Sequence, residues 1–343
     1  MEDLETSIQN IKKGFDASSK EKLLCLSTTA NLNNPDVFFG GIRETTTSIA
    51  GNIIVRTLDT IEYIIETFDG YVSYFLIDCE IKNEVPNLEA YALTRIHKSK
   101  ILVYKPNDFT VASLDMLLAC TRGSLRGKKV AIVGLGNVGA KIALQLCERG
   151  ANILVYERAQ ERMKAVIVGL NITKRSDTEI VGFSTLLDAV QNADIVLGCT
   201  PGIPAIDEKV IECIKENAMI IDVGNGTLTE NGIIEAKKRN MEIHVLSSFG
   251  GYIGMIENWL FQRKMLEGIR QKKFEGFAVI VPGILGARYD ILVDSIENIT
   301  RVIGLCDGKG DIMPIAEAKK FLQEVQETPE NKDTLETIKQ LYL

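Results

Sequence analysis

Three glycines with dinucleotide-binding spacing carry the clearest chemistry in this sequence. Gly134, Gly136 and Gly139 form the pattern Gly-x-Gly-x-x-Gly directly after the apolar run Val130–Val133. The first glycine permits a tight turn, the second lets the backbone approach a pyrophosphate, and the third lets helix and strand pack closely. The free N–H groups and the dipole of the helix that follows favour bound phosphate. The sequence therefore predicts a strand, a turn and a helix that hold a dinucleotide.

An acidic residue follows at the distance that a ribose contact requires. A helix is expected over Ala140–Arg149 and a second strand over Asn152–Tyr156, which ends at Glu157. A carboxylate about twenty residues after the glycines can accept a hydrogen bond from a ribose 2′-OH. Glu157 would repel a 2′-phosphate, which favours NAD over NADP, although the neighbouring Arg158 and Arg162 could bind that phosphate.

Further strand ends point to the same cofactor. Thr200 and Pro201 follow the expected strand 193–199, and Gly224 and Asn225 follow the expected strand 218–223. Small residues at these positions suit a flat ring that lies against the backbone, although each segment also fits an ordinary turn. The predicted cofactor-binding residues are Gly134, Gly136, Asn137, Val138, Gly139, Glu157, Arg158, Thr200, Pro201, Gly224 and Asn225.

Proton-transfer groups are expected on the other side of a cleft, before the dinucleotide strand. Asp78 ends the apolar segment 71–77, and Lys105, Asn107 and Asp108 precede the expected helix Thr110–Thr121. A lysine and an aspartate in a cleft can exchange a proton with a hydroxyl or carbonyl group while a hydride moves to a cofactor. We therefore predict Asp108, Lys105, Asp78 and Asn107 as catalytic residues, with a solvated surface loop as the alternative.

Composition narrows the class of protein. The 343 residues are 45% hydrophobic and carry a net charge of −7 without a basic block, which argues against nucleic acid or an anionic membrane as the partner. Seven scattered cysteines without a Cys-x-x-Cys pair, and only two histidines, argue against a structural metal site and a disulfide framework. The acidic N-terminus is not a signal peptide, and no apolar run is long enough to span a membrane. These features predict a cytoplasmic protein with no metal.

Alternating strands and helices predict an α/β fold with a doubly wound parallel sheet. We expect a substrate or catalytic α/β domain over residues 1–110, an NAD-binding Rossmann domain over 111–255, and C-terminal helices over 256–343 that pack back on the hinge or the first domain. Helices are expected at 1–24, at 45–68, at 250–275, at 289–305 and at 314–343. Loops are expected at 31–36 and around Pro86.

Two segments resemble S-adenosylhomocysteine hydrolase. The first contains Asn107-Asp108 and runs through Ser124-Leu125 into Gly127–Ala131, and the second contains Cys199-Thr200 and Gly224. The resemblance covers about residues 105–250, and it implies a two-domain NAD protein in which Asn107 and Asp108 are polar catalytic groups. The Gly-Lys, strand and Gly-x-Gly-Asn-Val-Gly arrangement is similar to the amino-acid dehydrogenases and to the wider set of two-domain NAD dehydrogenases, including hydroxyacid dehydrogenases.

Three functions remain open at this stage. The first is an NAD-dependent oxidoreductase on a small polar substrate bound between domains, and the second is a hydrolase-like enzyme that holds and recycles its NAD. The third is a nucleotide-sensing protein without catalysis. A homodimer is expected because related two-domain proteins are usually oligomers and because the segment 289–305 is strongly apolar.

Overall fold

The computed structural model describes residues 2–29, 34–82 and 87–343, and it divides the chain into two compact units, Met1–Glu257 and Asn258–Leu343. Residues 31–33 of one predicted loop and Pro86 of the other lie outside the described residues. Among the described residues no helix is long and apolar enough to cross a membrane, and no three potential metal ligands are grouped together.

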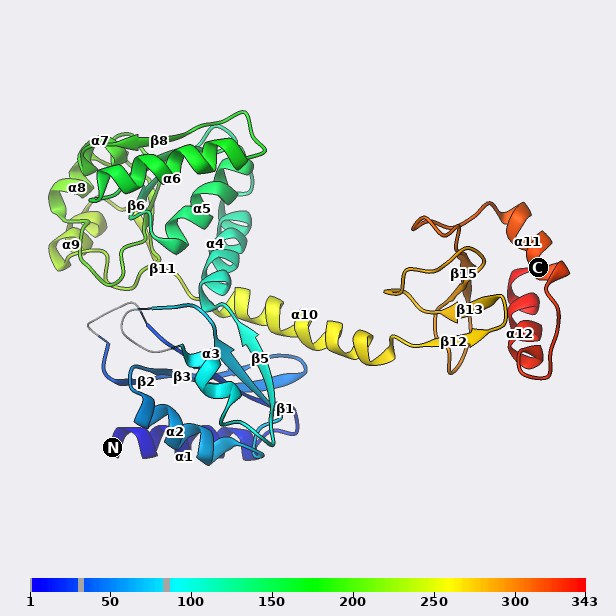
Figure 1. Ribbon diagram of the computed structural model, residues 1–343. Coiled ribbons are helices and arrows are strands. Elements are labelled where there is room, and N and C mark those ends of the chain that lie inside the picture. The colour runs from blue at the N-terminus through cyan, green and yellow to red at the C-terminus, as the bar shows by residue number, and fades with distance from the viewer. Residues whose placement is uncertain (1, 30–33, 83–86) are drawn as a thin grey trace. The chain divides into compact units, whose positions relative to one another are not determined.

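The first unit begins with a five-stranded sheet in the order β2-β3-β1-β4-β5, in which only the edge strand β2 is antiparallel (Figure 1). Its strands are β1 (Glu21–Ser27), β2 (Val37–Glu44), β3 (Ser48–Val55), β4 (Tyr74–Asp78) and β5 (Lys100–Tyr104). Its helices are α1 (Glu2–Asp16), α2 (Leu58–Phe68) and α3 (Leu88–Leu93). The apolar side chains of α1, α2 and α3 form one buried cluster with one face of the sheet.

Helix α4 (Pro106–Arg122) leads to a six-stranded parallel sheet in the order β11-β10-β9-β6-β7-β8. The strands are β6 (Lys129–Val133), β7 (Asn152–Tyr156), β8 (Ile180–Phe183), β9 (Ile195–Gly198), β10 (Met219–Asp222) and β11 (Glu242–Val245). The helices are α5 (Asn137–Glu148), α6 (Gln160–Thr173), α7 (Leu186–Val190), α8 (Glu208–Cys213) and α9 (Glu230–Lys238). The chain crosses from one side of β6 to the other, so a topological switch lies between β6 and β9, where such folds bind ligands.

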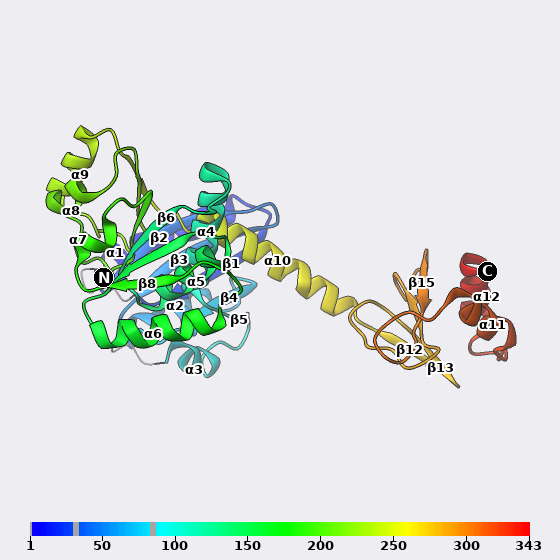
Figure 2. The ribbon, with the colours of Figure 1, turned by 90° about the horizontal axis from the view of Figure 1, so that it is seen from above.

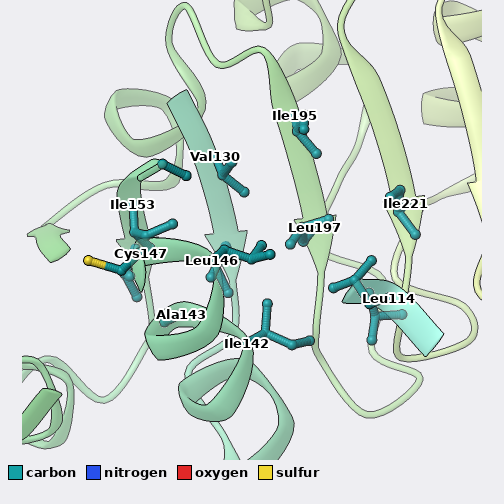
Figure 3. Close-up of a cluster of buried hydrophobic side chains, with 14 of the residues drawn as sticks. Leu114, Val130, Ile142, Ala143, Leu146, Cys147, Ile153, Ile195, Leu197 and Ile221 are labelled. Atoms are coloured by element: carbon teal, nitrogen blue, oxygen red, sulfur yellow. The ribbon is translucent and has the colours of Figure 1, made fainter. Parts of the chain in front are cut away.

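Helices cover both faces of this sheet. On one face, α4, α5 and α6 pack on the strands, and Figure 3 shows Ile142 and Leu146 of α5 beside Val130 and Leu197 of the strands. On the other face, α7, α8 and α9 pack on the alternate strand residues. Burial on both faces explains the continuous apolar strands. The prediction of a doubly wound Rossmann sheet with a further α/β part is confirmed.

The second unit has its own sheet, in the order β12-β13-β14-β15 (Figure 2). Helix α10 (Phe249–Gly268) runs into this unit, which contains β12 (Gln271–Phe274), β13 (Phe277–Ile280), β14 (Ile291–Val293), β15 (Val302–Leu305), α11 (Ile315–Glu324) and α12 (Lys332–Tyr342). Helices α11 and α12 share one buried apolar cluster with the strands. The C-terminal part therefore contains a sheet and is not built of helices alone.

Several predicted helices are wrong in extent or in kind. The expected helix 1–24 ends at Asp16, and β1 begins at Glu21. The expected helix 45–68 is the strand β3 followed by α2, because the β-branched run from Ser48 packs in the middle of a sheet. The expected helix 250–275 stops at Gly268, before β12.

The apolar segment 289–305 is also not a helix. It forms β14 and β15, joined by a turn in which the carboxylate of Asp294 accepts hydrogen bonds from the backbone N–H groups of Ser295, Thr300 and Arg301. Its apolar side chains are the inner face of a sheet. The apolar segment 289–305 therefore no longer supports a homodimer, which stays a prediction. The predicted division of residues 1–255 into two domains at 110 also stays a prediction.

Candidate dinucleotide and charge-network site

The three glycines of the turn after β6 differ in what surrounds them. Gly134 has a φ of +101°, and a Cβ there would lie 3.0 Å from the carbonyl carbon of Cys199. A Cβ on Gly139 would lie 2.1 Å from the carbonyl oxygen of Gly134. A Cβ on Gly136, by contrast, would meet no protein atom within 4 Å. Gly134 and Gly139 are thus required by the protein itself, whereas Gly136 keeps space open on the outside of the turn.

This open space lies at the beginning of a helix. Gly136 is the N-cap of α5 and provides no side-chain hydrogen bond, and the first turn of α5 contains no acidic residue. The first N–H groups of a helix lack partners within the helix, and together with the helix dipole they attract an anion. Asn137 is exposed, and Val138 packs against the core cluster below. The residues present therefore fit a pyrophosphate.

The carboxylate of Glu157 is connected to the glycine-rich turn. Its Oε2 accepts a hydrogen bond of 2.9 Å from the backbone N–H of Leu135, and its Oε1 lies 3.4 Å from the N–H of Ala159. Oε2 thus holds the turn, whereas Oε1 makes only the longer contact and would be the oxygen left to accept from a ribose hydroxyl. Arg158 is exposed beside it.

The loops after β9 and β10 lie against each other. A Cβ on Gly224 would be 1.8 Å from the carbonyl oxygen of Thr200, and the N–H of Gly202 lies within hydrogen-bond distance of both the Thr200 and the Gly224 oxygens. Asn225 adopts a φ of +57°, and Pro201 is exposed. Since Gly134 also touches the backbone at Cys199, the structure brings the predicted residues of three strand ends together.

A second set of groups lies at the ends of β1 and β4 in the five-stranded sheet. Asp78 is 1% exposed, and its Oδ2 accepts hydrogen bonds from the backbone N–H and the hydroxyl of Thr28. The same oxygen is 2.7 Å from the ammonium nitrogen of Lys82, which also lies 3.4 Å from Glu80. The Lys82 side chain is only 10% exposed, so this ion pair is largely shielded from water. A small cavity of about 10 Å³, large enough for one water molecule, is lined by Asp78, Glu80 and Thr28 among others.

Asp108 forms the link from this set to the dinucleotide helix. Its carboxylate lies 2.7 Å from the ammonium of Lys105 and 2.6 Å from that of Lys141 on α5. Burial alone would raise the pKa of Asp108, but hydrogen bonds and charges from the two lysines outweigh it and hold the pKa below its usual value. Asp108 is therefore a carboxylate at neutral pH and a weak base.

Asn107 makes a parallel connection. Its backbone N–H donates to Glu80 at 3.1 Å, and its side-chain nitrogen lies 3.4 Å from the Oδ1 of Asn137, the first residue of α5. Lys141 also lies 3.8 Å from Glu80. The predicted residues Asp78, Asn107, Asp108 and Lys105 thus belong to one network that reaches the start of the dinucleotide helix.

Sequence reasoning missed two lysines of this network. Lys82 follows Asp78 by four residues in a polar loop, and Lys141 follows Asn137 by one helical turn. The helical spacing of Asn137 and Lys141 places both on the side of α5 that Asn107 and Asp108 contact, which was the one signal available. The contact between Lys141 and Asp108 joins positions 33 residues apart, so spacing alone does not reveal it.

Comparison with known proteins agrees with this geometry. Residues 129–249 match the NAD binding domain of 6-phosphogluconate dehydrogenase, so this part of the chain is an NAD-binding domain. Phenylalanine dehydrogenase from Lysinibacillus sphaericus is 33% identical over 125 residues, which are 33% of this chain and 31% of that protein. Adenosylhomocysteinase from Thermoplasma acidophilum is 24% identical over 140 residues, 40% of this chain and 31% of that protein. The resemblance to both enzyme families is thereby confirmed.

A solved structure that covers more of the chain is only distantly similar. The A chain of dipicolinate synthase from Bacillus subtilis has a TM-score of 0.37 and 14% identity, over 73% of this chain and 98% of that structure. The chain matches less than a third of the length of the first curated relatives. Activity and substrate therefore have to be argued from the residues of this chain.

Proposed function

We propose that the chain is an NAD-dependent oxidoreductase that acts on a small polar substrate. One observation carries the proposal: the network of Asp78, Lys82 and Asp108 reaches the helix whose N-terminus fits a pyrophosphate, through Asn107 and Lys141. Groups that transfer protons and a site that binds a redox cofactor are thus connected through direct contacts. The preference for NAD over NADP is part of the proposal, because Glu157 holds a negative charge beside the glycine-rich turn.

NAD, when bound, would supply the hydride acceptor, and a residue of this chain would have to take the proton of the substrate's hydroxyl or amino group. Lys82 and Asp78 are the best-shielded pair for that proton, because their side chains are 10% and 0% exposed and their charged atoms are 2.7 Å apart. The Thr28 N–H and hydroxyl hold the Asp78 oxygen in place. In the direction of reduction the Lys82 ammonium would donate a proton to the new hydroxyl or amino group, and in the direction of oxidation the neutral Lys82 amine would take that proton back. Asp78 keeps Lys82 oriented.

The remaining predicted residues have supporting roles in this proposal. Lys105 and Asp108 form a more exposed pair, with side chains 55% and 25% accessible. We assign to this pair and to Asn107 the binding of a polar substrate group beside α5. The role of Thr200, Gly224 and Asn225 is to pack against the nicotinamide side of the cofactor.

The direct test replaces Lys82. Lys82→Met should reduce turnover at least a hundredfold, by the usual contribution of general acid–base catalysis, and leave the NAD affinity within twofold. Lys98→Met, an exposed lysine of the same sheet region, is the matched control. Turnover is followed as NAD reduction and NAD affinity by calorimetry. Normal turnover of Lys82→Met, with the fold intact, would refute the assignment.

A hydrolase-like enzyme that recycles its NAD is the second candidate, favoured by the adenosylhomocysteinase relative. That candidate predicts NAD at stoichiometric level in the purified protein and no net reduction of added NAD. A nucleotide sensor predicts reversible NAD binding without turnover of any substrate. The absorbance of the purified protein and a steady-state assay separate the three.

We also propose a cytoplasmic setting and a homo-oligomer. All seven cysteines are free thiols, as is usual in a reducing compartment. Sedimentation at micromolar concentration should give a species heavier than the 37.9 kDa chain. A single species at the mass of one chain would rule out the oligomer.

A further inference from the structure

One buried carboxylate at the strand ends has no role in the proposed function so far. Asp222 is the last residue of β10, at the edge of the parallel sheet where folds of this kind bind their ligands. The residue is only 8% exposed. Aspartate is rarely buried without a partner of opposite charge, because removing a charge from water costs free energy. The burial of Asp222 therefore requires a reason.

Neutral groups hold this carboxylate. Its Oδ2 accepts a hydrogen bond of 2.7 Å from the backbone N–H of Gly226, and its Oδ1 accepts one of 2.9 Å from the hydroxyl of Thr227. The N–H of Thr227 lies 3.3 Å from Oδ2. The ion pairs formed among the described residues do not include Asp222. The donors thus stabilise the ionised carboxylate without neutralising its charge.

The loop that Asp222 holds has an unusual backbone. Asn225 has a φ of +57° and Gly226 a φ of +97°, and residues other than glycine seldom adopt positive values. Gly198 of β9 leaves room for Thr227, because a Cβ on Gly198 would lie 2.0 Å from the Thr227 hydroxyl oxygen. Backbone of this kind persists where surrounding contacts hold it, and it gathers at ligand sites. Asp222 is the residue that holds this loop in place.

The charge of Asp222 also acts beyond its own loop. Burial raises the pKa of the Cys199 thiol to about 12, and the negative charge of Asp222 adds to that rise. Cys199 follows β9, and its backbone is the one that a Cβ on Gly134 would touch. Asp222 therefore belongs to the three strand ends at which the proposed function places the nicotinamide side of the cofactor.

The charge network of the proposed function does not offset this charge. Its carboxylates and its ammonium groups are equal in number and are joined in pairs: Asp78, Glu80 and Asp108 with Lys82, Lys105 and Lys141. Paired opposite charges largely cancel at a distance. Asp222 thus contributes an unbalanced negative charge at the strand ends. Such a charge distinguishes the two forms of the cofactor, because the oxidised nicotinamide ring is positive and the reduced ring is neutral.

We propose that Asp222 makes the site bind the oxidised cofactor, NAD+, more tightly than the reduced cofactor, NADH. This inference rests on the proposed function and gives it a direction. Opposite charges attract strongly where little water screens them. Preference for the oxidised form favours reduction of the substrate, in which a hydride passes from NADH to a carbon atom and a proton passes to the attached oxygen or nitrogen. The Lys82 ammonium supplies that proton, and NAD+ remains in the site.

Asp222→Asn removes the charge and preserves the hydrogen bonds. The asparagine oxygen can accept from the Gly226 N–H, and its nitrogen can donate to the Thr227 hydroxyl oxygen. Calorimetry gives the dissociation constants of NAD+ and of NADH. The constant for NADH should exceed that for NAD+ in the wild-type protein, and Asp222→Asn should lower the ratio of the two at least tenfold. Tenfold corresponds to about 30 mV in the potential of the bound two-electron couple.

Two control variants separate the charge from the shape of the loop. Thr227→Val removes one hydrogen bond to Asp222 and keeps the charge, so it should weaken both cofactor forms alike. Asp194→Asn removes a carboxylate of the same sheet that lies 2.6 Å from the Lys215 ammonium, so the ratio should stay as in the wild type. An equal fall of the ratio in Thr227→Val and in Asp222→Asn would show that loop geometry sets the preference, which overturns the proposal.

The wild-type protein alone also provides a test, which holds even if a variant fails to fold. Binding of NADH as tight as that of NAD+, or tighter, overturns the proposal. An unchanged ratio of the dissociation constants in a folded Asp222→Asn protein overturns it as well.

The two proposals can fail separately. If NAD+ is preferred through Asp222 but no substrate is turned over, the oxidoreductase function fails and the charge effect stands. If a substrate is turned over with NAD and the ratio is the same in wild type and Asp222→Asn, the function stands and the charge effect fails. Failure of both cofactor forms to bind overturns both proposals.

Discussion

The glycines of the dinucleotide turn allow ligand binding and folding to be tested by different substitutions. Gly136→Val places a side chain where a Cβ meets no protein atom within 4 Å, so the protein tolerates it sterically. Because Gly136 is the N-cap of α5, the helix loses about 1 kcal/mol at most through poorer capping. The same side chain fills the space through which a pyrophosphate would approach the backbone. We expect the NAD affinity to fall at least tenfold and the melting temperature of the cofactor-free protein to change little.

Gly139→Ala should behave in the opposite way. Its Cβ would lie 2.1 Å from the carbonyl oxygen of Gly134, a backbone atom that cannot turn aside. Overpacking of this kind costs about 1–3 kcal/mol or more, so the cofactor-free protein should melt at a clearly lower temperature. Gly136→Ser is the matched control for Gly136→Val. It changes the same N-cap position, but serine caps a helix well and adds a smaller group than valine.

The assays are thermal denaturation without cofactor and calorimetry with NAD, applied to all three variants. Unchanged NAD affinity in Gly136→Val would refute the location of the pyrophosphate. A cofactor-free Gly139→Ala protein as stable as the wild type would refute the packing argument. The contrast between the two variants is the informative result, since a general loss of folding would affect both assays together.

Three other perturbations test the acidic residue after β7, the ion pairs and the buried thiols. Glu157→Gln keeps an oxygen that can accept from the Leu135 N–H but removes the negative charge. The preference for NAD over NADP should therefore fall at least tenfold at low salt. An unchanged ratio of the two dissociation constants would show that Glu157 does not select the cofactor. Asp108→Asn should destabilise the protein by about 1 kcal/mol at neutral pH. The pKa of Asp108 is lowered in the folded protein, so the stabilisation by its ion pairs is complete above the ordinary carboxyl pKa of about 4. This stabilisation is lost as the pH falls through the lowered pKa. Urea denaturation of both proteins measures it, and an equal effect of Asp108→Asn at neutral and strongly acidic pH would contradict the ion pairs. Alkylation of the native protein should modify the exposed Cys120 long before Cys199, because burial raises the pKa of the Cys199 thiol to about 12. Mass spectrometry of the digested protein checks the order. Early labelling of Cys199 would show that its loop opens.

The nucleotide domain was predictable because local signals there agree with the final packing. The central strands β6, β9 and β10 are buried on both faces and appear in the sequence as short apolar runs. Gly134 and Gly139 are glycines for reasons of backbone geometry and packing. The segments 45–68 and 289–305 were misread because short apolar runs fit a helix and a strand equally well. Their state is decided by neighbours distant in the chain, such as β1 and β2 for β3.

The candidate site likewise contains residues that could be predicted from the sequence and residues that could not. The glycine-rich turn and Glu157 could be found from spacing, since the strand and helix between them have standard lengths. Lys82 and Lys141 could not, because their importance depends on contacts between separate elements and on burial. Nothing in the local sequence of a polar loop shows whether a lysine forms a shielded ion pair or extends its ammonium group into water.

The ion pairs also decide which carboxylate is suited to proton transfer. Asp108, the leading candidate from sequence, is held ionised by Lys105 and Lys141, and a carboxylate with a lowered pKa is a poor base and a poorer acid near neutral pH. Its two partners come from the start of α4 and from α5, so its contacts join the two elements. Asp78 ends β4 and Lys82 follows in the next loop, and the side chains of both have little access to water. Asp108 is therefore the residue that holds the dinucleotide helix beside the charge network, and Lys82 is the one placed to carry a proton.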